Sequence, residues 1–343
     1  MKKLNAAVIG CGSISPNHLE TLLNCQDANL IAVCDIDEQK VRKASQKYNC
    51  KAYTDYKEML KYEDIDVVHI CTPHYLHAPI AIEAMKAGKN VLTEKPMAIS
   101  ISDAKEMINV SKETDMKLGV CFQNRYNTTS IRIKELIESG RVGSVIGGKA
   151  SVTWHRDEVY YASAEWRGTW DKEGGGVLIN QAIHTLDLLQ WLIGDIDKVK
   201  GTIDTRLLNK FIEVEDTAEA TILFKNKATV LFYATNCYAV NSPVEIELIC
   251  EKAIINLRDD LTVTYKNGEI EKVNDKVKAT GEKAYWGIGH SLLINDFYKK
   301  LLNGEEISIN GEEGIKAIQM FNAIYTSNKT KEYVAFEALR VFE

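Results

Sequence analysis

An apolar run from Leu4 to Ile9 leads directly into Gly10-Cys11-Gly12-Ser13-Ile14-Ser15, and this feature constrains the fold more than any other in the sequence. A strand, a glycine-rich turn and a helix start in this order form the context of a dinucleotide-binding fingerprint. Gly10 permits the tight turn, and Gly12 lacks the Cβ that would obstruct a pyrophosphate held by backbone N–H groups at the helix N-terminus. Ser15 replaces the third glycine of the pattern, which makes the motif alone less specific. We expect a nucleotide-binding α/β domain with cofactor contacts from Gly10, Gly12, Ser13 and Ile14.

Asp35 follows the next apolar run, residues 29–34, and lies 25 residues after Gly10. An acidic side chain there can accept hydrogen bonds from both hydroxyls of an adenosine ribose, and it would repel a 2′-phosphate. Asp37 adds a second negative charge. The sequence therefore predicts NAD rather than NADP as the cofactor. The alternative is that both aspartates only cap the following helix, although capping and ribose binding can coexist.

Short apolar runs alternate with amphipathic stretches through residue 123, a pattern typical of βαβ units and a parallel sheet. Ser100 is a plausible N-cap for the fourth amphipathic stretch, with Asp103 three residues later. We therefore expect residues 1–123 to form a doubly wound α/β domain that binds NAD. The expected strands are 4–9, 29–34, 66–71, 90–93 and 117–122, and the expected helices are 13–24, 37–47, 76–87 and 100–113.

After Arg125 the pattern changes to long segments with period-2 alternation. Such alternation indicates strands with one buried and one polar face, as in an antiparallel sheet. We therefore expect residues 124–343 to form a second, α+β domain. Its expected strands include 218–224, 229–235 and 244–249, and its expected helices are 128–139, 287–303 and 311–327.

The composition limits the classes of partner. The 343 residues include 42 Lys and Arg against 48 Asp and Glu, a net charge of −6, whereas nucleic-acid binding relies on clustered basic residues. No two of the eight cysteines are spaced C-x-x-C, which argues against a zinc knuckle or a dithiol redox motif, and we expect no metal site. No stretch approaches the roughly 20 apolar residues of a membrane span. We expect a cytoplasmic protein with reduced cysteines and a small-molecule ligand.

The apolar run 90–93 ends in Glu94-Lys95-Pro96. Proline has no N–H for a strand ladder, so the strand stops there and presents Lys95 at the carboxyl end of the sheet, where ligands of open α/β sheets bind. A lysine in that position is suited to proton transfer to or from a substrate hydroxyl. From position alone, a solvated surface lysine is the more frequent explanation.

The segment from Gly174 to Asp187 contains a second candidate site. After three consecutive glycines it predicts a helix to about residue 193, and at about 100° per residue Asn180, His184 and Asp187 fall within an arc of roughly 60°. A polar stripe on such an apolar helix has to be hydrogen-bonded. His184 can share a proton with a substrate hydroxyl through one nitrogen while Asp187 holds the other. The alternative is a core histidine that is satisfied within the protein.

Together these motifs resemble the glucose–fructose oxidoreductase / inositol dehydrogenase (Gfo/Idh/MocA) family of NAD(P)-dependent oxidoreductases over nearly the whole chain. The combination of Glu94-Lys95-Pro96 with the glycine run and His184 is specific. The resemblance implies a Rossmann domain followed by a domain with a large open sheet, which usually mediates dimer or tetramer formation. It also implies that Lys95 contacts nicotinamide ribose and substrate, with His184 as its partner in proton transfer. The further cofactor contacts that it implies are Thr72, Pro73, His77, Glu94 and Gln123.

Aromatic and basic residues before the glycine run predict a carbohydrate site. The faces of Tyr160-Tyr161 and Trp166 can pack on a sugar and Arg167 can hold a carboxylate, although Trp166 can equally be a core residue. Many members of the family have an aspartate where this chain has Asn180, and an amide cannot take up a proton. The expected substrate contacts are Lys95, Arg125, Tyr161, Trp166, Arg167, Asn180 and His184, and His290 after Gly287-Ile288-Gly289 is a further candidate.

These features predict an oxidoreductase that moves a hydride between a nicotinamide cofactor and a hydroxyl or carbonyl carbon of a sugar, cyclitol or sugar derivative. Lys95 and His184 are the expected proton relay. One alternative is an enzyme that retains NAD and cleaves or epimerises a glycoside without net oxidation. A second alternative is an NAD-binding regulatory protein without catalysis.

Overall fold

The computed structural model describes residues 3–274 and 289–337, which divide into two units. Of the described residues, the first unit comprises 3–123 and 289–315, and the second comprises 124–274 and 316–337. Helix α9 (Gly289–Asn303) packs against α1 (Ser15–Asn24) and so belongs with the first unit. The contiguous second domain expected over 124–343 therefore differs from the observed division. A periodic sequence pattern predicts a helix but does not show which sheet that helix covers.

The first unit contains a six-stranded parallel sheet with the order β3-β2-β1-β4-β5-β6, as the doubly wound fold expected from the sequence requires. Its central strand β4 consists of fully buried apolar residues and His69, because helices cover both faces of such a sheet. The strands are β1 (Leu4–Ile9), β2 (Ala28–Cys34), β3 (Lys51–Tyr53), β4 (Val67–Ile70), β5 (Asn90–Thr93) and β6 (Leu118–Val120), and the helices besides α1 and α9 include α2 (Glu38–Tyr48), α3 (Tyr56–Tyr62), α4 (His77–Lys86) and α5 (Ile101–Thr114).

Two elements of this unit were missed by the sequence patterns, β3 and α3. Strand β3 has three residues at the edge of the sheet, and Lys51 and Ala52 are exposed, so it contains no apolar run. The predicted caps by Ser100 and Asp37 are both present in the structure. Ser100 Oγ accepts a hydrogen bond from Asp103 N at 3.0 Å, and Asp37 caps α2 through the N–H groups of its first turn.

The second unit contains a nine-stranded sheet with the order β14-β13-β12-β11-β7-β10-β9-β8-β15. Strands β7 and β10 pair in parallel and the other neighbours pair antiparallel, which confirms the large, mostly antiparallel sheet. The strands are β7 (Val145–Thr153), β8 (Ile196–Asp204), β9 (Thr217–Phe224), β10 (Thr229–Thr235), β11 (Glu245–Cys250), β12 (Ala253–Arg258), β13 (Asp260–Tyr265), β14 (Ile270–Val273) and β15 (Val334–Ala335).

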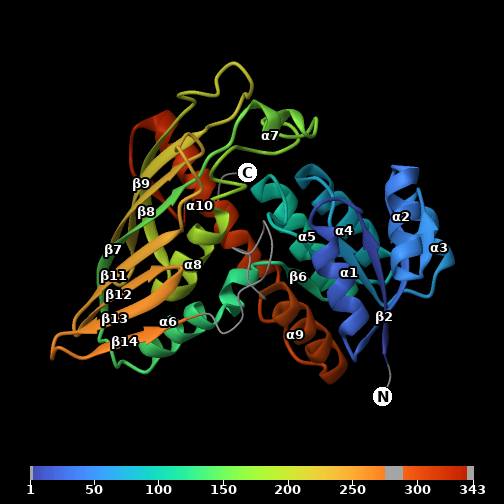
Figure 1. The fold of residues 1–343 in the computed structure, drawn as a ribbon, viewed down its shortest axis with the longest axis horizontal. Coiled ribbons are helices and arrows are strands. Elements are labelled where there is room, and N and C mark those ends of the chain that lie inside the picture. The colour runs from blue at the N-terminus through green and yellow to red at the C-terminus, as the bar shows by residue number, and fades with distance from the viewer. Residues whose placement is uncertain (1–2, 275–288, 338–343) are drawn as a thin grey trace. The chain divides into compact units, whose positions relative to one another are not determined.

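Helices cover one face of this sheet and leave the other face open (Figure 1). Helix α8 (Ile183–Ile193) contacts β7 and α6 (Thr128–Glu138), and Ser327 of α10 (Gly311–Thr330) accepts a hydrogen bond from β8. Along β10, Val230, Phe232 and Ala234 are buried while Leu231 and Tyr233 are exposed. Within the described residues, no helix is long and apolar enough to cross a bilayer.

Candidate active site

The glycine turn after β1 is fixed on one side and open on the other. Gly10 has a φ of +95°, and a Cβ there would lie 2.5 Å from the carbonyl oxygen of Cys71. A Cβ on Gly12 would meet no protein atom within 4 Å. Gly10 is therefore required by the fold, whereas Gly12 borders open space at the start of α1. This space, beside the N–H groups of a helix start, fits the pyrophosphate of a dinucleotide.

Asp35 lies directly beside this turn, at the end of β2. Its Oδ2 accepts a hydrogen bond from Cys11 N at 2.7 Å, and its Oδ1 accepts one from Asp37 N at 2.9 Å. Asp37, not Asp35, is the N-cap of α2. The alternative in which both aspartates serve only as caps therefore does not describe Asp35. Each carboxylate oxygen keeps a further lone pair that can accept a hydrogen bond from a ribose hydroxyl.

The segment after β4 brings three of the expected cofactor residues together. Thr72 Oγ1 is buried and has no hydrogen-bond partner in the part of the chain that the structure describes. His77 Nε2 lies 2.8 Å from the Thr72 carbonyl, and His77 Nδ1 lies 2.6 Å from the carbonyl of Pro96. Burial lowers the pKa of His77, although both carbonyls favour its charged form. His77 thus ties the Thr72-Pro73 turn to the segment that contains Lys95.

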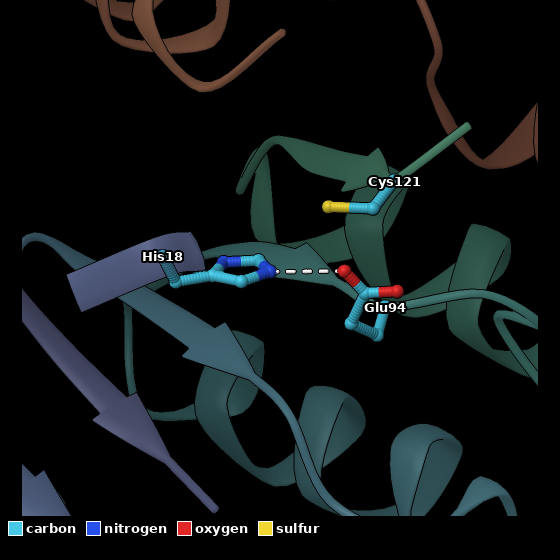
Figure 2. Close-up of side chains that lie close together, drawn as sticks. All are labelled: His18, Glu94 and Cys121. Carbon is cyan, nitrogen blue, oxygen red and sulfur yellow. Dashed lines mark hydrogen bonds and ion pairs between the residues drawn. The ribbon is translucent and has the colours of Figure 1, made fainter. Parts of the chain in front are cut away.

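Lys95 is half-buried at the end of β5, and the neighbouring Glu94 turns its side chain into the protein (Figure 2). Glu94 Oε1 lies 2.9 Å from His18 Nε2 and 3.1 Å from His290 Nε2. Burial alone would raise the pKa of Glu94, but the hydrogen bonds from both histidines outweigh burial and hold it well below its ordinary value. His290 therefore belongs to the first unit beside Glu94, and the preceding Gly287 and Ile288 lie outside the described residues.

Figure 2 also shows Cys121 close to His18 and Glu94, an arrangement of three metal-ligating residue types. The hydrogen bond between His18 and Glu94 already joins the two ligand atoms that an ion would have to separate. Burial raises the pKa of Cys121 well above its ordinary value, and the nearby charge of Glu94 adds to this effect. The geometry is that of a hydrogen-bonded cluster around a carboxylate.

The glycine run of the second unit folds differently from the prediction. Helix α8 begins at Ile183, so Asn180 precedes it and does not share a helical face with His184. The cause is Glu215, whose carboxylate accepts hydrogen bonds from Gly176 N at 2.9 Å and Leu178 N at 3.0 Å. These N–H groups hold the backbone of the run in turns rather than in a helix. Sequence analysis missed Glu215, which precedes β9 with no motif around it.

Asp187 makes a contact that the helical spacing did not predict, and its pairing with His184 stays a prediction. Both oxygens of Asp187 accept hydrogen bonds from Arg125, from Nε at 2.8 Å and from Nη2 at 2.6 Å. This buried two-pronged ion pair joins α8 to the 3₁₀ turn of residues 123–126. Arg125 thus uses its guanidinium inside the unit, and its predicted contact with substrate stays a prediction. His184 is half-buried in the first turn of α8.

A polar cluster surrounds Asn180. Its Nδ2 donates to Glu173 Oε1 at 2.6 Å and to Tyr160 Oη at 3.3 Å. The guanidinium of Arg167 hydrogen-bonds to Tyr160 and lies 4.3 Å from the Tyr160 ring centre and 4.7 Å from that of Trp166. Glu173, which is 1% exposed, is a second residue that sequence analysis missed.

Tyr161, in contrast, is a core residue of the second unit. It is buried against Leu208, Ile212 and Val214, and its hydroxyl accepts a hydrogen bond from Asn236 at 2.9 Å. Burial raises the pKa of this hydroxyl far above its ordinary value. Its predicted stacking on a sugar stays a prediction.

Comparisons with known proteins agree with the class that this fold and turn define, a nucleotide-dependent oxidoreductase. Residues 4–122 match the family described as "Oxidoreductase family, NAD-binding Rossmann fold", and residues 131–256 match the "GFO/IDH/MocA C-terminal domain". The chain therefore belongs to the Gfo/Idh/MocA family of oxidoreductases, and its first unit is an NAD-binding Rossmann domain, as the motifs predicted.

Three relatives illustrate the similarity. The WlbA dehydrogenase from Chromobacterium violaceum, solved with NADH and UDP-GlcNAcA, is 31% identical, with a TM-score of 0.85 and coverage of 98% of this chain and 96% of that chain. The WlbA dehydrogenase from Bordetella pertussis, solved with the same two ligands, is 29% identical, with a TM-score of 0.85 and coverage of 97% and 99%. Myo-inositol 2-dehydrogenase from Thermotoga maritima is 25% identical over 97% of this chain and 99% of its own length.

The two glycines of the turn give a matched pair of variants. Gly10→Ala should lower the free energy of unfolding by about 2–4 kcal/mol, because its Cβ would press on the Cys71 carbonyl at a positive φ. Gly12→Ala should leave it within about 0.5 kcal/mol of the parent and weaken NAD binding at least tenfold. Urea unfolding and NADH fluorescence titration measure both. Equal loss of stability in the two variants, or full NAD affinity in Gly12→Ala, would contradict this account.

Glu215 should make stability fall as the pH rises. Burial raises its pKa from 4.5 to about 7 in the folded protein. A raised carboxyl pKa means that the folded state binds the proton more tightly, so about 3 kcal/mol is lost as the pH rises from 4.5 to about 7. Urea unfolding across this range should show the stability of the parent declining relative to Glu215→Gln. Glu165→Gln makes the same replacement at an exposed glutamate and serves as the control, and a pH-independent difference for Glu215→Gln would refute the prediction.

Proposed function

We propose that this protein is an NAD-dependent dehydrogenase that acts on a hydroxyl-bearing carbon, or on the corresponding carbonyl, of a sugar, cyclitol or sugar derivative. The observation that carries the proposal lies within the first unit. Strands β1, β2, β4 and β5 run parallel, so their carboxyl ends bring Gly10, Asp35, Thr72 and Lys95 to the same edge of the sheet. A dinucleotide turn and a half-buried lysine on one edge support proton transfer beside a bound nicotinamide.

In this proposal, the N–H groups after Gly12 hold the pyrophosphate and Asp35 accepts hydrogen bonds from the adenosine ribose, which favours NAD over NADP. Bound NAD supplies the hydride acceptor. Lys95 exchanges a proton with the substrate hydroxyl, and His184 is its partner in that exchange. The remaining predicted cofactor contacts are Ser13, Ile14, Thr72, Pro73, His77, Glu94 and Gln123.

The second unit supports a substrate that carries an acidic group. The guanidinium of Arg167 lies near the rings of Tyr160 and Trp166, which combines a carboxylate partner with apolar faces for a sugar ring. Asn180 adds an amide that can bind a sugar hydroxyl. The relatives solved with UDP-GlcNAcA and the relative named for myo-inositol span acidic sugars and cyclitols. A screen should therefore include both classes.

The open face of the nine-stranded sheet is the proposed interface of a homodimer or homotetramer. A hollow of about 520 Å³ on this face is lined by Lys149, Lys200, Glu219 and Glu245 together with Leu231. A surface with charges of both signs can pair with itself across a two-fold axis. The eight cysteines are all free thiols, which supports a cytoplasmic location.

Lys95→Met should lower turnover by about 10²–10⁴-fold and leave NADH affinity within about threefold, because methionine keeps the apolar stem and cannot exchange a proton. Turnover is measured as NADH formation across cyclitols, aldoses and sugar acids, both free and nucleotide-linked. Lys86→Met, at an exposed lysine of the same unit, is the control. Undiminished turnover in Lys95→Met would refute the assignment. Sugar conversion by the parent without net NADH would instead favour the redox-neutral alternative.

Leu231→Glu should convert the assembly to monomers at micromolar concentration, because leucine 60% exposed on the open face would become a buried charge in the interface. Analytical ultracentrifugation measures the change. Val159→Glu adds the same charge at an exposed apolar position away from the sheet and should leave the assembly intact. A monomeric parent, or an unchanged assembly in Leu231→Glu, would exclude this interface.

A further inference from the structure

Buried side chains of the first unit form a continuous hydrogen-bonded chain that ends on Glu94. Tyr298 Oη lies 2.9 Å from His69 Nε2, His69 Nδ1 lies 2.8 Å from His18 Nδ1, and His18 Nε2 lies 2.9 Å from Glu94 Oε1. His290 Nε2 meets the same carboxylate oxygen at 3.1 Å. The chain links α1, β4 and α9 to the residue directly before Lys95.

The surroundings of this chain favour one arrangement of its protons. An ionised carboxylate only accepts hydrogen bonds, so His18 carries its proton on Nε2. Burial lowers the pKa of His18 and holds that of His69 well below its ordinary value, which disfavours the charged form of each ring, so we assign both rings as neutral. His18 Nδ1 is then an acceptor, and His69 donates to it through Nδ1. His69 Nε2 is left as an acceptor for the hydroxyl of Tyr298.

All three hydrogen bonds therefore point toward Glu94, and each strengthens the next. The chain does not carry protons to solvent, because it ends at Tyr298, which is 0% exposed. A proton shift toward Glu94 would leave a buried tyrosinate, and burial raises the pKa of Tyr298 well above its ordinary value. The chain is consequently suited to holding a carboxylate in place rather than to relaying protons.

We propose that the Tyr298–His69–His18–Glu94 chain is a positioning unit for Lys95. Glu94 Oε2 accepts a hydrogen bond from the backbone N–H of Lys95 at 3.3 Å, and Glu94 N donates to the Ile70 carbonyl at 2.9 Å. The same carboxylate binds His18 of α1, the helix that begins at the dinucleotide turn. The chain thereby holds the lysine in register with the cofactor turn, which is the precision that proton transfer requires. This inference rests on the proposed function, because the only role it gives Lys95 is the proton transfer proposed there.

Side-chain nitrogen NMR of isotope-labelled histidines in the whole protein tests the proton order directly. His18 should appear as the neutral Nε2–H tautomer and His69 as the neutral Nδ1–H tautomer from about pH 5 to 8. A protonated ring or the opposite tautomer at either position would overturn the proposal. This measurement does not depend on the substrate, so it stays valid if the proposed function fails.

Kinetics test the positioning. His18→Leu removes both hydrogen bonds and should lower kcat at least tenfold, with KM and NADH affinity within about threefold of the parent. His18→Gln supplies an N–H toward Glu94 and a carbonyl toward His69, and it should restore kcat to within about threefold. His155→Leu makes the same replacement at an exposed histidine and serves as the control. An unchanged kcat in His18→Leu, or no rescue by glutamine, would refute the positioning role.

Two further variants separate the possible failures. If His18→Leu does not fold, Tyr298→Phe removes a single buried hydroxyl, and it should lower kcat and give His69 a mixture of tautomers. An unchanged kcat and tautomer in Tyr298→Phe would overturn the proposal. Loss of turnover in Lys95→Met together with normal kcat in His18→Leu would refute the positioning unit alone, whereas turnover retained in Lys95→Met would refute the proposed function.

Discussion

The close contact between Gly10 and the carbonyl of Cys71 is the constraint on which the first unit depends. In the strand order β3-β2-β1-β4-β5-β6, the chain leaves β1 toward β2 and later returns to β4 on the other side of β1. The turn after β1 is held by both neighbours, through Gly10 N to the Cys34 carbonyl and Cys71 N to the Ile9 carbonyl, each at 2.7 Å. Because both neighbouring strands hold this turn in place, the space beside Gly12 stays open. The cofactor site is thus a consequence of how the sheet reverses its strand order.

Two buried glutamates fix the chain segments on which the proposed chemistry depends, one in each unit. Glu94 accepts hydrogen bonds from His18 and His290, and these bonds hold its pKa well below its ordinary value although burial acts in the opposite direction. Glu215 accepts mainly backbone N–H groups of the glycine run and one tyrosine hydroxyl, from Tyr325, and burial raises its pKa to about 7. The pKa values of the two carboxylates therefore shift in opposite directions, although burial raises both. The difference lies in how strongly their donors compensate for lost solvation.

Sequence patterns correctly predicted the structural features that depend on residues adjacent in the chain. The glycine turn, the Ser100 cap and the strand that ends before Lys95 depend on neighbours within a few positions, and the structure contains all three. Partners far apart in sequence could not be predicted in this way. Asp187 pairs with Arg125 across 62 residues, and Glu215 holds a glycine run 37 to 39 residues before it. Helical spacing predicted that Asp187 serves His184, but spacing alone cannot show that another element brings a guanidinium to the same carboxylate.

The amide at position 180 is best understood together with Glu173. Asn180 Nδ2 donates to Glu173 Oε1 at 2.6 Å, and Glu173 also accepts a hydrogen bond from Gly168 N at 2.5 Å while being almost wholly buried. An aspartate at position 180 would set two carboxylates at that separation, and like charges so close cannot both stay ionised without a strong cost. An amide removes the conflict and supplies the donor that the buried glutamate needs. In this chain the negative charge beside position 180 is therefore supplied by Glu173, and Asn180 serves as its hydrogen-bond donor.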